Sequence, residues 1–346
     1  MMSSRDSRID CLRLVLMFMI CMIHAVGYVD SRWTHWLTNV CFSGVLGFVL
    51  ISGFYGIRFS LSKVIKLEGV GLGCALTVVG GAWLAGEKFQ FASAGAEVLT
   101  LWKGYWFIHA YVVMMFLAAL VGECDASGEK ENWMRMAVPF IVLVYGWSFL
   151  MLIPGVQKFI PRTPGLVPFS GITLFAGYLV GRLYRIFDWD RIPAKWVMVA
   201  ALVGFLFSSS ILPPFNSWGA PLARYNSPFL LLLSLSLFWL FRHLPKPSVP
   251  SLFLTLLTPS IFSVYLLHCN PHGYSVFAHV ESWLSAHGVC SYGIYFFLAA
   301  LAFVGGFLLD LPRRLLVRLF HKPISYLSSH LDQLYTTLIS LPSKTS

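Results

Sequence analysis

The chain has 346 residues, of which 57% are hydrophobic and only 12% are charged, with a mean hydropathy of +0.73. A soluble protein carries about 25% charged residues, so this composition excludes a soluble globular protein and predicts one that crosses a membrane several times. The net charge of +10 would suit nucleic acid, but basic cytoplasmic loops explain it in a membrane protein, and we expect no nucleic-acid partner.

Ten hydrophobic stretches have the composition of membrane-spanning helices, and the ninth is short enough to suggest a broken or tilted helix. They cover residues 9–29, 36–57, 67–85, 104–121, 134–153, 169–187, 195–212, 228–244, 256–270 and 291–311. We therefore predict an all-α polytopic membrane protein, with about ten transmembrane helices in one bundle over residues 1–311. The basic segment 312–346 is expected to be an amphipathic cytoplasmic tail held at the membrane by lipids.

The first stretch carries Asp10, Arg13 and His24, although an ionisable group in lipid is costly. Arg13 and His24 are eleven residues apart, which at about 100° per residue returns them to nearly the same helix face. The rise between them is about 16 Å, roughly half of the hydrocarbon thickness. Asp10 precedes Arg13 by three residues and can pair with it. This polar stripe must therefore face protein or water.

The distribution of Lys and Arg predicts the orientation. With the N-terminus in the cytoplasm, nineteen of the 25 basic residues fall in inner segments and six in outer ones. This excess supports ten spans with both termini in the cytoplasm. Arg13 would then lie near the cytoplasmic face and His24 in the outer half of the bilayer.

Later spans bring further polar side chains to these two depths. The start of the fourth span and the end of the ninth reach the depth of His24 and carry Tyr105, Trp106, His109, Tyr111, Tyr265, His268 and Asn270. The end of the second span and the loop after it reach the depth of Arg13 and carry Ser52, Arg58, Lys63 and Lys66.

Structural roles for these residues remain open. The aromatic residues could form an interfacial belt, and the two lysines could serve only as topology signals. His268 could cap a helix, and His24 and His109 could form hydrogen bonds between helices.

The cysteines and the remaining histidines give no clear site. The seven cysteines are scattered and contain no C-x-x-C pair, so they indicate neither a disulfide frame nor a metal centre. His272, His279 and His287, in the last outer loop, have irregular spacing and only Glu281 nearby. We therefore expect no metal site and no permanently bound cofactor.

Four segments form a set of motifs in a fixed order. Arg13 and His24 stand in an R-x10-H arrangement, preceded by Ile-Asp at 9–10, and FVLISGFYGIRF occupies 48–59. These resemble the first helix and the SGF segment of the acyltransferase-3 family of integral membrane acyltransferases.

The later segments continue the resemblance. YWFIHAY at 105–111 resembles the WF-x-x-x-Y segment of the family, and SVYLLHCNPH at 263–272 resembles its IYLIH segment, with the trailing Asn of the polysaccharide-modifying branch. The chain departs from the family at 117–120, where Ser-Pro and then Asn are common, and it has Lys63-x-x-Lys66 in place of R-x-x-R.

The resemblance implies an O-acetyltransferase of the bacterial inner membrane. It would move an acyl group, usually acetyl from acetyl-CoA, to a hydroxyl of a surface glycan or lipid-linked sugar. The phosphates of CoA suit basic and hydroxyl side chains on the cytoplasmic side, namely Arg13, Ser52, Arg58, Lys63 and Lys66. The sugar would contact the aromatic, His and Asn side chains of the fourth and ninth spans.

The resemblance also suggests roles in the reaction. His24 would act as general base toward the sugar hydroxyl, or it would be acylated itself. Asp10 would orient Arg13, and His268 or Tyr105 would stabilise the oxyanion.

Two other functions fit the same sequence. The polar stripe could be a path through a non-enzymatic transporter or flippase of a lipid-linked sugar, although carboxylates other than Asp10 are scarce in the spans. The chain could also be a structural subunit of a glycan-assembly complex. The glycan, the acyl group and the oligomeric state stay open.

Overall fold

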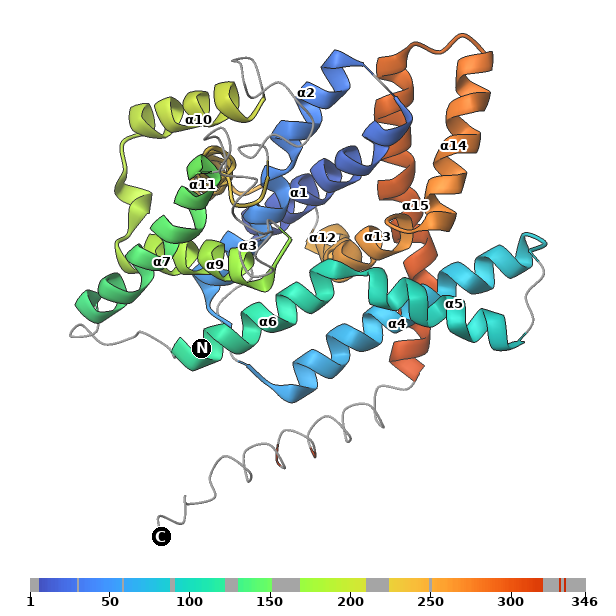
Figure 1. Cartoon of the computed structure of the whole chain (residues 1–346), viewed down its shortest axis with the longest axis horizontal. Helices are drawn as coiled ribbons and strands as arrows, with labels where there is room; N and C mark the ends of the chain where they lie inside the picture. The colour runs from blue at the N-terminus through green and yellow to red at the C-terminus, as the bar shows by residue number, and fades with distance from the viewer. Residues whose placement is uncertain are drawn as a thin grey trace.

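The computed structural model describes a chain built from helices (Figure 1). It describes residues 6–29, 31–57, 59–87, 91–121, 130–150, 169–209, 224–248 and 251–319, together with 330 and 333. Within these ranges there are helices and no strands, which confirms the predicted all-α class.

The helices follow one another closely along the chain. They are α1 (Ser7–Ala25), α2 (Arg32–Cys41), α3 (Ser43–Tyr55), α4 (Leu61–Leu84), α5 (Phe91–Gly104), α6 (Trp106–Val121), α7 (Lys130–Leu150), α9 (Gly171–Ile186), α10 (Ala194–Ser208), α11 (Pro228–His243), α12 (Ser251–Leu257), α13 (Ile261–His268), α14 (Pro271–Ala286) and α15 (Ser291–Leu319). Short 3-10 helices lie at Val26–Tyr28, Trp189–Arg191 and Thr258–Ser260.

Each of the ten predicted spans falls on one or two of these helices. In the described ranges, five segments are long and apolar enough to cross a membrane, and a sixth results if the pair Ser93–Gly104 and Trp106–Val121, bent by 52°, is one span. Shorter apolar helices are Ala194–Ser208, Pro228–His243 and Leu254–His268. The protein is therefore a polytopic membrane protein, while the number ten stays a prediction.

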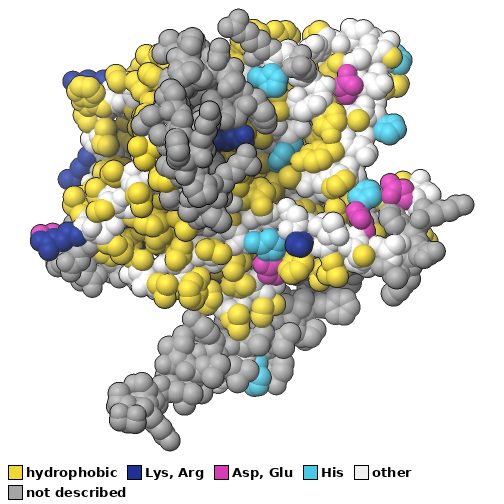
Figure 2. Space-filling view, viewed as in Figure 1, with side chains coloured by type: hydrophobic (Ala, Val, Ile, Leu, Met, Phe, Trp, Pro, Cys, Tyr) yellow, Lys and Arg dark blue, Asp and Glu magenta, His cyan; other side chains and the backbone are white. Residues whose placement is uncertain are grey.

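The outer surface suits contact with lipid. Hydrophobic side chains cover much of the face seen in Figure 2, and charged side chains form small separate groups on it. Large apolar residues such as Leu84, Val142 and Met198 are exposed. An outer surface with this many exposed large apolar side chains faces a membrane or another protein.

Two features differ from the sequence-based expectation. The segment with His272, His279 and His287 is not a loop but the helix α14, which begins at the N-cap Asn270 with Pro271 in its first turn. Helix α15 continues past residue 311 to Leu319. Most of the predicted tail, 320–346, lies outside the described residues, so the division at 311 stays a prediction.

Helix α1 lies at the centre of the bundle (Figure 1). It packs against α2, α3, α11, α13 and α15. Ile9, Leu12 and Leu16 are fully buried, because this helix is apolar around most of its circumference and such a helix is stable only inside a protein or membrane.

Helices α3 and α9 cross in backbone contact. A Cβ atom on Gly53 would overlap the carbonyl of Tyr178, and one on Gly181 would overlap the carbonyl of Leu50. Glycine at both positions lets the helices approach this closely. The crossing brings the end of α3 next to the last turns of α9.

Candidate active site

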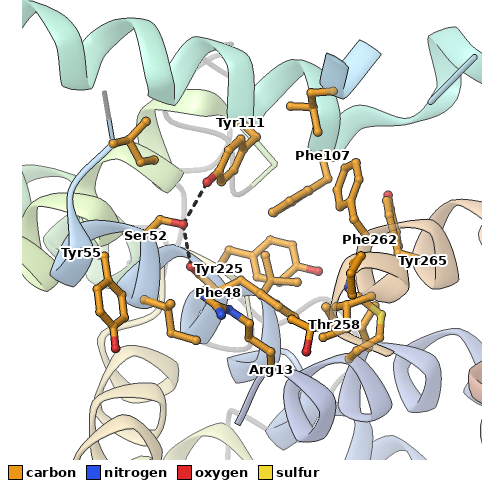
Figure 3. A pocket seen from close by; sticks show the side chains of 18 of the residues that line it. Arg13, Phe48, Ser52, Tyr55, Phe107, Tyr111, Tyr225, Thr258, Phe262 and Tyr265 are labelled. Carbon is orange, nitrogen blue, oxygen red and sulfur yellow. Dashed lines mark hydrogen bonds between the residues drawn. The ribbon is translucent and has the colours of Figure 1, made fainter. Parts of the chain in front are cut away.

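A cavity of about 500 Å³ lies beside α1, with walls from α3, α6 and α13 (Figure 3). Its lining is mostly apolar and aromatic, with a few polar side chains. The lining includes Arg13, Met17, Ile20, His24, Phe48, Ser52, Gly56, Ile57, Trp106, Phe107, Tyr111, Tyr225, Phe262 and Tyr265.

One face of α1 supplies a wall of the cavity. Arg13, Met17, Ile20 and His24 all line it, and their spacings of four, three and four residues are those of a single helix face. The predicted stripe is therefore present, and it faces an internal cavity. Two apolar side chains separate its two polar ends.

The Arg13 end is held by an ion pair. Arg13 Nη1 donates to Asp10 Oδ1 at 2.8 Å, and Asp10 is buried, with 1% of its surface exposed. This confirms the predicted pairing of the two residues. The carboxylate holds the guanidinium end of the Arg13 side chain at the cavity wall.

The end of α3 lies on the same side as the start of α1. Gly44 packs on Leu16 and Ile20, whereas Ile51, near the end of α3, belongs to one buried cluster with Ile9 at the start of α1. Helix α3 therefore runs toward the beginning of α1. Ser52 therefore reaches the Arg13 end of the cavity.

Ser52 is joined to α6 through a hydroxyl pair. Its Oγ donates to the carbonyl of Phe48 at 3.0 Å and lies 3.0 Å from the hydroxyl of Tyr111 (Figure 3). We expected Tyr111 at the depth of His24, and this is wrong. Tyr111 is five residues beyond Trp106 on α6, a rise of about 7.5 Å, which carries it toward the Arg13 end.

A chain of hydrogen bonds fixes His24 at the other end. His268 Nδ1 is 2.5 Å from the carbonyl oxygen of Val264, and His268 Nε2 is 2.9 Å from His24 Nδ1. A carbonyl only accepts, so His268 Nδ1 carries the hydrogen and, in the neutral ring, His268 Nε2 is an acceptor. His24 Nδ1 then donates to it. The lone pair of the neutral His24 ring is therefore on Nε2.

Cys269 and Tyr274 complete the surroundings of His24. Cys269 Sγ is 3.5 Å from His24 Nε2 and 3.4 Å from the Tyr274 hydroxyl. Sequence reasoning missed both residues. A signal for Cys269 was present, because it directly follows His268 in the chain. The thiol donates weakly, so an incoming hydroxyl can replace it at Nε2.

Aromatic rings line the His24 end. Trp106 stacks on Tyr225, with ring centroids 5.6 Å apart, and Tyr265 lies 5.9 Å from His24 between centroids. Phe107 contacts Phe262 at 5.9 Å. Such surfaces suit the apolar faces of a sugar ring or of a thioester substrate.

A family model decides between the functions that the sequence left open. The model described as an acyltransferase domain, of the acyltransferase-3 family, matches residues 6–311. The chain belongs to this family. It is therefore a membrane acyltransferase. No curated protein and no solved structure matches the chain.

Several residues predicted for the site of this acyltransferase lie outside the cavity lining. Tyr105 is buried in the core, with 1% exposed. His109 faces Glu68, with His109 Nδ1 3.5 Å from Glu68 Oε1. Asn270 caps α14, because its Oδ1 accepts from the Gly273 amide.

Two of the predicted basic residues also lie outside the lining. Lys63 and Lys66 lie exposed in the first turns of α4. Arg58 lies outside the described residues. In the described ranges, no group of three His, Cys, Asp or Glu side chains could hold a metal ion.

Proposed function

We propose that this acyltransferase moves an acetyl group from cytoplasmic acetyl-CoA to a hydroxyl of a cell-surface or lipid-linked polysaccharide. In this proposal it resides in a bacterial inner membrane with both termini in the cytoplasm. The observation that supports the proposal best is the cavity along α1, which has Arg13 at one end and His24 at the other.

The dimensions of the cavity suit an extended thioester donor. The rise from Arg13 to His24 is about 16 Å, and Met17 and Ile20 form an apolar wall between them. A pantetheine arm is long and thin and carries its thioester at one end and phosphate at the other. Arg13 provides a charged partner near the phosphate end.

The lone pair on His24 Nε2 supplies the chemistry in the first route. It takes the proton of the sugar hydroxyl while the hydroxyl oxygen attacks the thioester carbonyl. The new C–O bond forms, the C–S bond breaks, and the proton passes from His24 to the leaving thiolate. His268 holds the ring through His24 Nδ1.

In the second route His24 carries the acyl group. Nε2 attacks the thioester carbonyl, so a C–N bond forms, the C–S bond breaks and the thiolate leaves. The sugar hydroxyl then attacks the acyl carbon, the C–N bond breaks as the C–O bond forms, and the hydroxyl proton passes to the thiolate. Both routes need the same tautomer of His24. They differ in whether an acyl-histidine forms in the absence of the acceptor.

The test is His24→Ala with His279→Ala as control, because His279 is an exposed histidine on α14 bonded to the Ser275 carbonyl. NMR of the surface glycan should show O-acetyl signals in wild type and the control. In His24→Ala they should fall about 100-fold or more, the size of a lost general base.

Inserted and folded His24→Ala protein that still acetylates the glycan fully would overturn the proposal. So would flux of a lipid-linked sugar across vesicles without acetyl-CoA, accompanied by no acetyl transfer, since this is the behaviour of a transporter.

A further inference from the structure

Arg182 on α9 is a buried arginine whose guanidinium Nε lacks an acceptor among the residues that the structure describes. Only 5% of the surface of Arg182 is exposed. This Nε is itself buried, with an exposed area below 1 Å². The ring of Trp133, with its centroid 5.8 Å from Arg182 Cζ, is its one described cation–π contact.

Burying a charged guanidinium with an unsatisfied donor costs the protein free energy when no ligand is bound. A guanidinium offers five N–H donors and keeps its charge at all working pH values. A buried charge is normally paired with a carboxylate or bound to a ligand. Other arginines in this region follow the rule, since Arg13 pairs with Asp10 and Arg242 pairs with Asp190.

The guanidinium lies directly behind the cavity wall. A Cβ atom on Gly56 would be 3.0 Å from Arg182 Nη1, and Gly56 itself lines the cavity. Gly56 has φ +78°, a conformation that favours glycine. The crossing of α3 and α9 at Gly53 and Gly181 creates this juxtaposition, because it sets the next residues of both helices side by side.

A backbone amide next to Gly56 can assist. The Ile57 amide is 3.5 Å from the Tyr178 hydroxyl, at the limit of a hydrogen bond. Ile57 also lines the cavity. A guanidinium and a weakly engaged amide at one point of the wall suit an anion with several acceptor oxygens.

We propose that Arg182 binds the diphosphate of the acyl donor at the Gly56 end of the cavity. The inference rests on the proposed function, since it assigns the donor's diphosphate to this site. The position agrees with that function, because Gly56 follows α3, whose end lies on the side of Arg13. A membrane-lipid phosphate has the same chemistry, and the experiment separates the two sources.

The first measurement compares two donors in the purified, lipid-reconstituted protein. Acetyl-CoA carries the diphosphate, whereas S-acetylpantetheine does not. Arg182→Gln should lower kcat/KM for acetyl-CoA about tenfold to hundredfold, through KM, the range of a lost charged hydrogen bond. With S-acetylpantetheine it should change less than about twofold. Arg182→Lys should recover part of the loss, since Lys keeps the charge but not the fork.

Arg185→Gln is the matched control. Arg185 lies three residues further on α9, is exposed, and donates from Nη1 to the Phe54 carbonyl at 3.3 Å. Arg185→Gln removes the same charge from the same end of α9 and should leave kcat/KM unchanged for both donors. Equal losses with both donors in Arg182→Gln would overturn the proposal and indicate a structural or lipid-binding role.

The second measurement uses inorganic pyrophosphate and needs no acyl transfer. Pyrophosphate should raise the melting temperature of wild type and Arg185→Gln but not of Arg182→Gln. An equal rise in all three would overturn the anion site. If neither donor is used by wild type but pyrophosphate binding still depends on Arg182, the proposed acetyl transfer fails and the donor assignment fails with it, while an anion site is shown.

Discussion

His268 acts on the proposed reaction through His24 and not through the substrate. It lies outside the cavity lining, yet its Nε2 accepts from His24 Nδ1 while its own Nδ1 is bound to the Val264 carbonyl. One backbone carbonyl thus decides which nitrogen of His24 faces the substrates. We had expected His268 to contact substrate or oxyanion, and the structure supports a positioning role more directly.

This role predicts a graded result at position 268. His268→Phe leaves His24 Nδ1 without an acceptor and should lower kcat about tenfold to hundredfold, the range of one lost hydrogen bond to a developing charge. His268→Gln supplies an amide oxygen and should recover part of the loss. The measurement is acetyl transfer at saturating donor in protein of matched melting temperature. Equal activity of wild type and His268→Phe would contradict the role.

The sequence alone could predict the contents of one helix but not the contacts between helices. Arg13 and His24 share a face because of helical periodicity, which is local. The contact of His24 with His268 joins residues 244 positions apart. The burial of Arg182 likewise depends on the crossing of α3 and α9, so neither could be derived from composition or spacing.

At the scale of elements, hydropathy located the helices well where they are apolar. It missed α14, because its polar His, Ser and Glu residues lower its mean hydropathy. Local signals were nevertheless present, since Asn270 is a favourable N-cap and Pro271 a favourable first residue. Helix α5, which packs beside α4, was missed for a similar reason, because its exposed polar residues lower its mean hydropathy.

The α3–α9 crossing predicts a sharp response to added volume. Gly181→Ala would place a methyl group against the Leu50 carbonyl and the Gly53 backbone, and we expect about 1–3 kcal/mol of destabilisation from overpacking. Gly80→Ala on α4 is the control, since nothing lies within 4 Å of its added Cβ. Thermal unfolding in detergent is the measurement, and similar melting temperatures for both variants would contradict the tight crossing.

At the scale of the whole molecule, a charge network ties distant parts of the chain together. Arg8 binds Asp6 at 2.9 Å, and Arg242 Nη1 lies 3.8 Å from Asp6 and Arg242 Nη2 2.5 Å from Asp190. The start of α1, the end of α11 and the turn after α9 therefore meet. The hydrogen bond from Arg8 lowers the pKa of Asp6 below 3.8.

The second carboxylate of the network responds in the same direction. Burial alone would raise the pKa of Asp190, but hydrogen bonds from Arg242 and Tyr184 outweigh it and lower the pKa below 3.8. A carboxyl group with a lower pKa in the folded state adds stability above its unfolded pKa. That stability is lost as the pH falls through the lower, folded value.

We therefore predict an acid-dependent loss of stability from this network. The melting temperature of wild type should fall as the pH drops below 3.8, the usual aspartate value. Asp6→Asn combined with Asp190→Asn should start lower at neutral pH and show a smaller fall. A double variant whose melting temperature follows the same pH curve as wild type would contradict the prediction.

The position of Arg13 and His24 on one unbroken helix has a consequence for inhibition. Their separation is set by the covalent geometry of α1, so movement of α6 or α13 around the cavity does not alter it. A rigid compound with an anion at one end and a hydroxyl at the other, joined by an apolar rod of that length, would meet both partners at once. Because neither the compound nor α1 would need to change its shape, little conformational entropy would be lost on binding and the affinity would be higher.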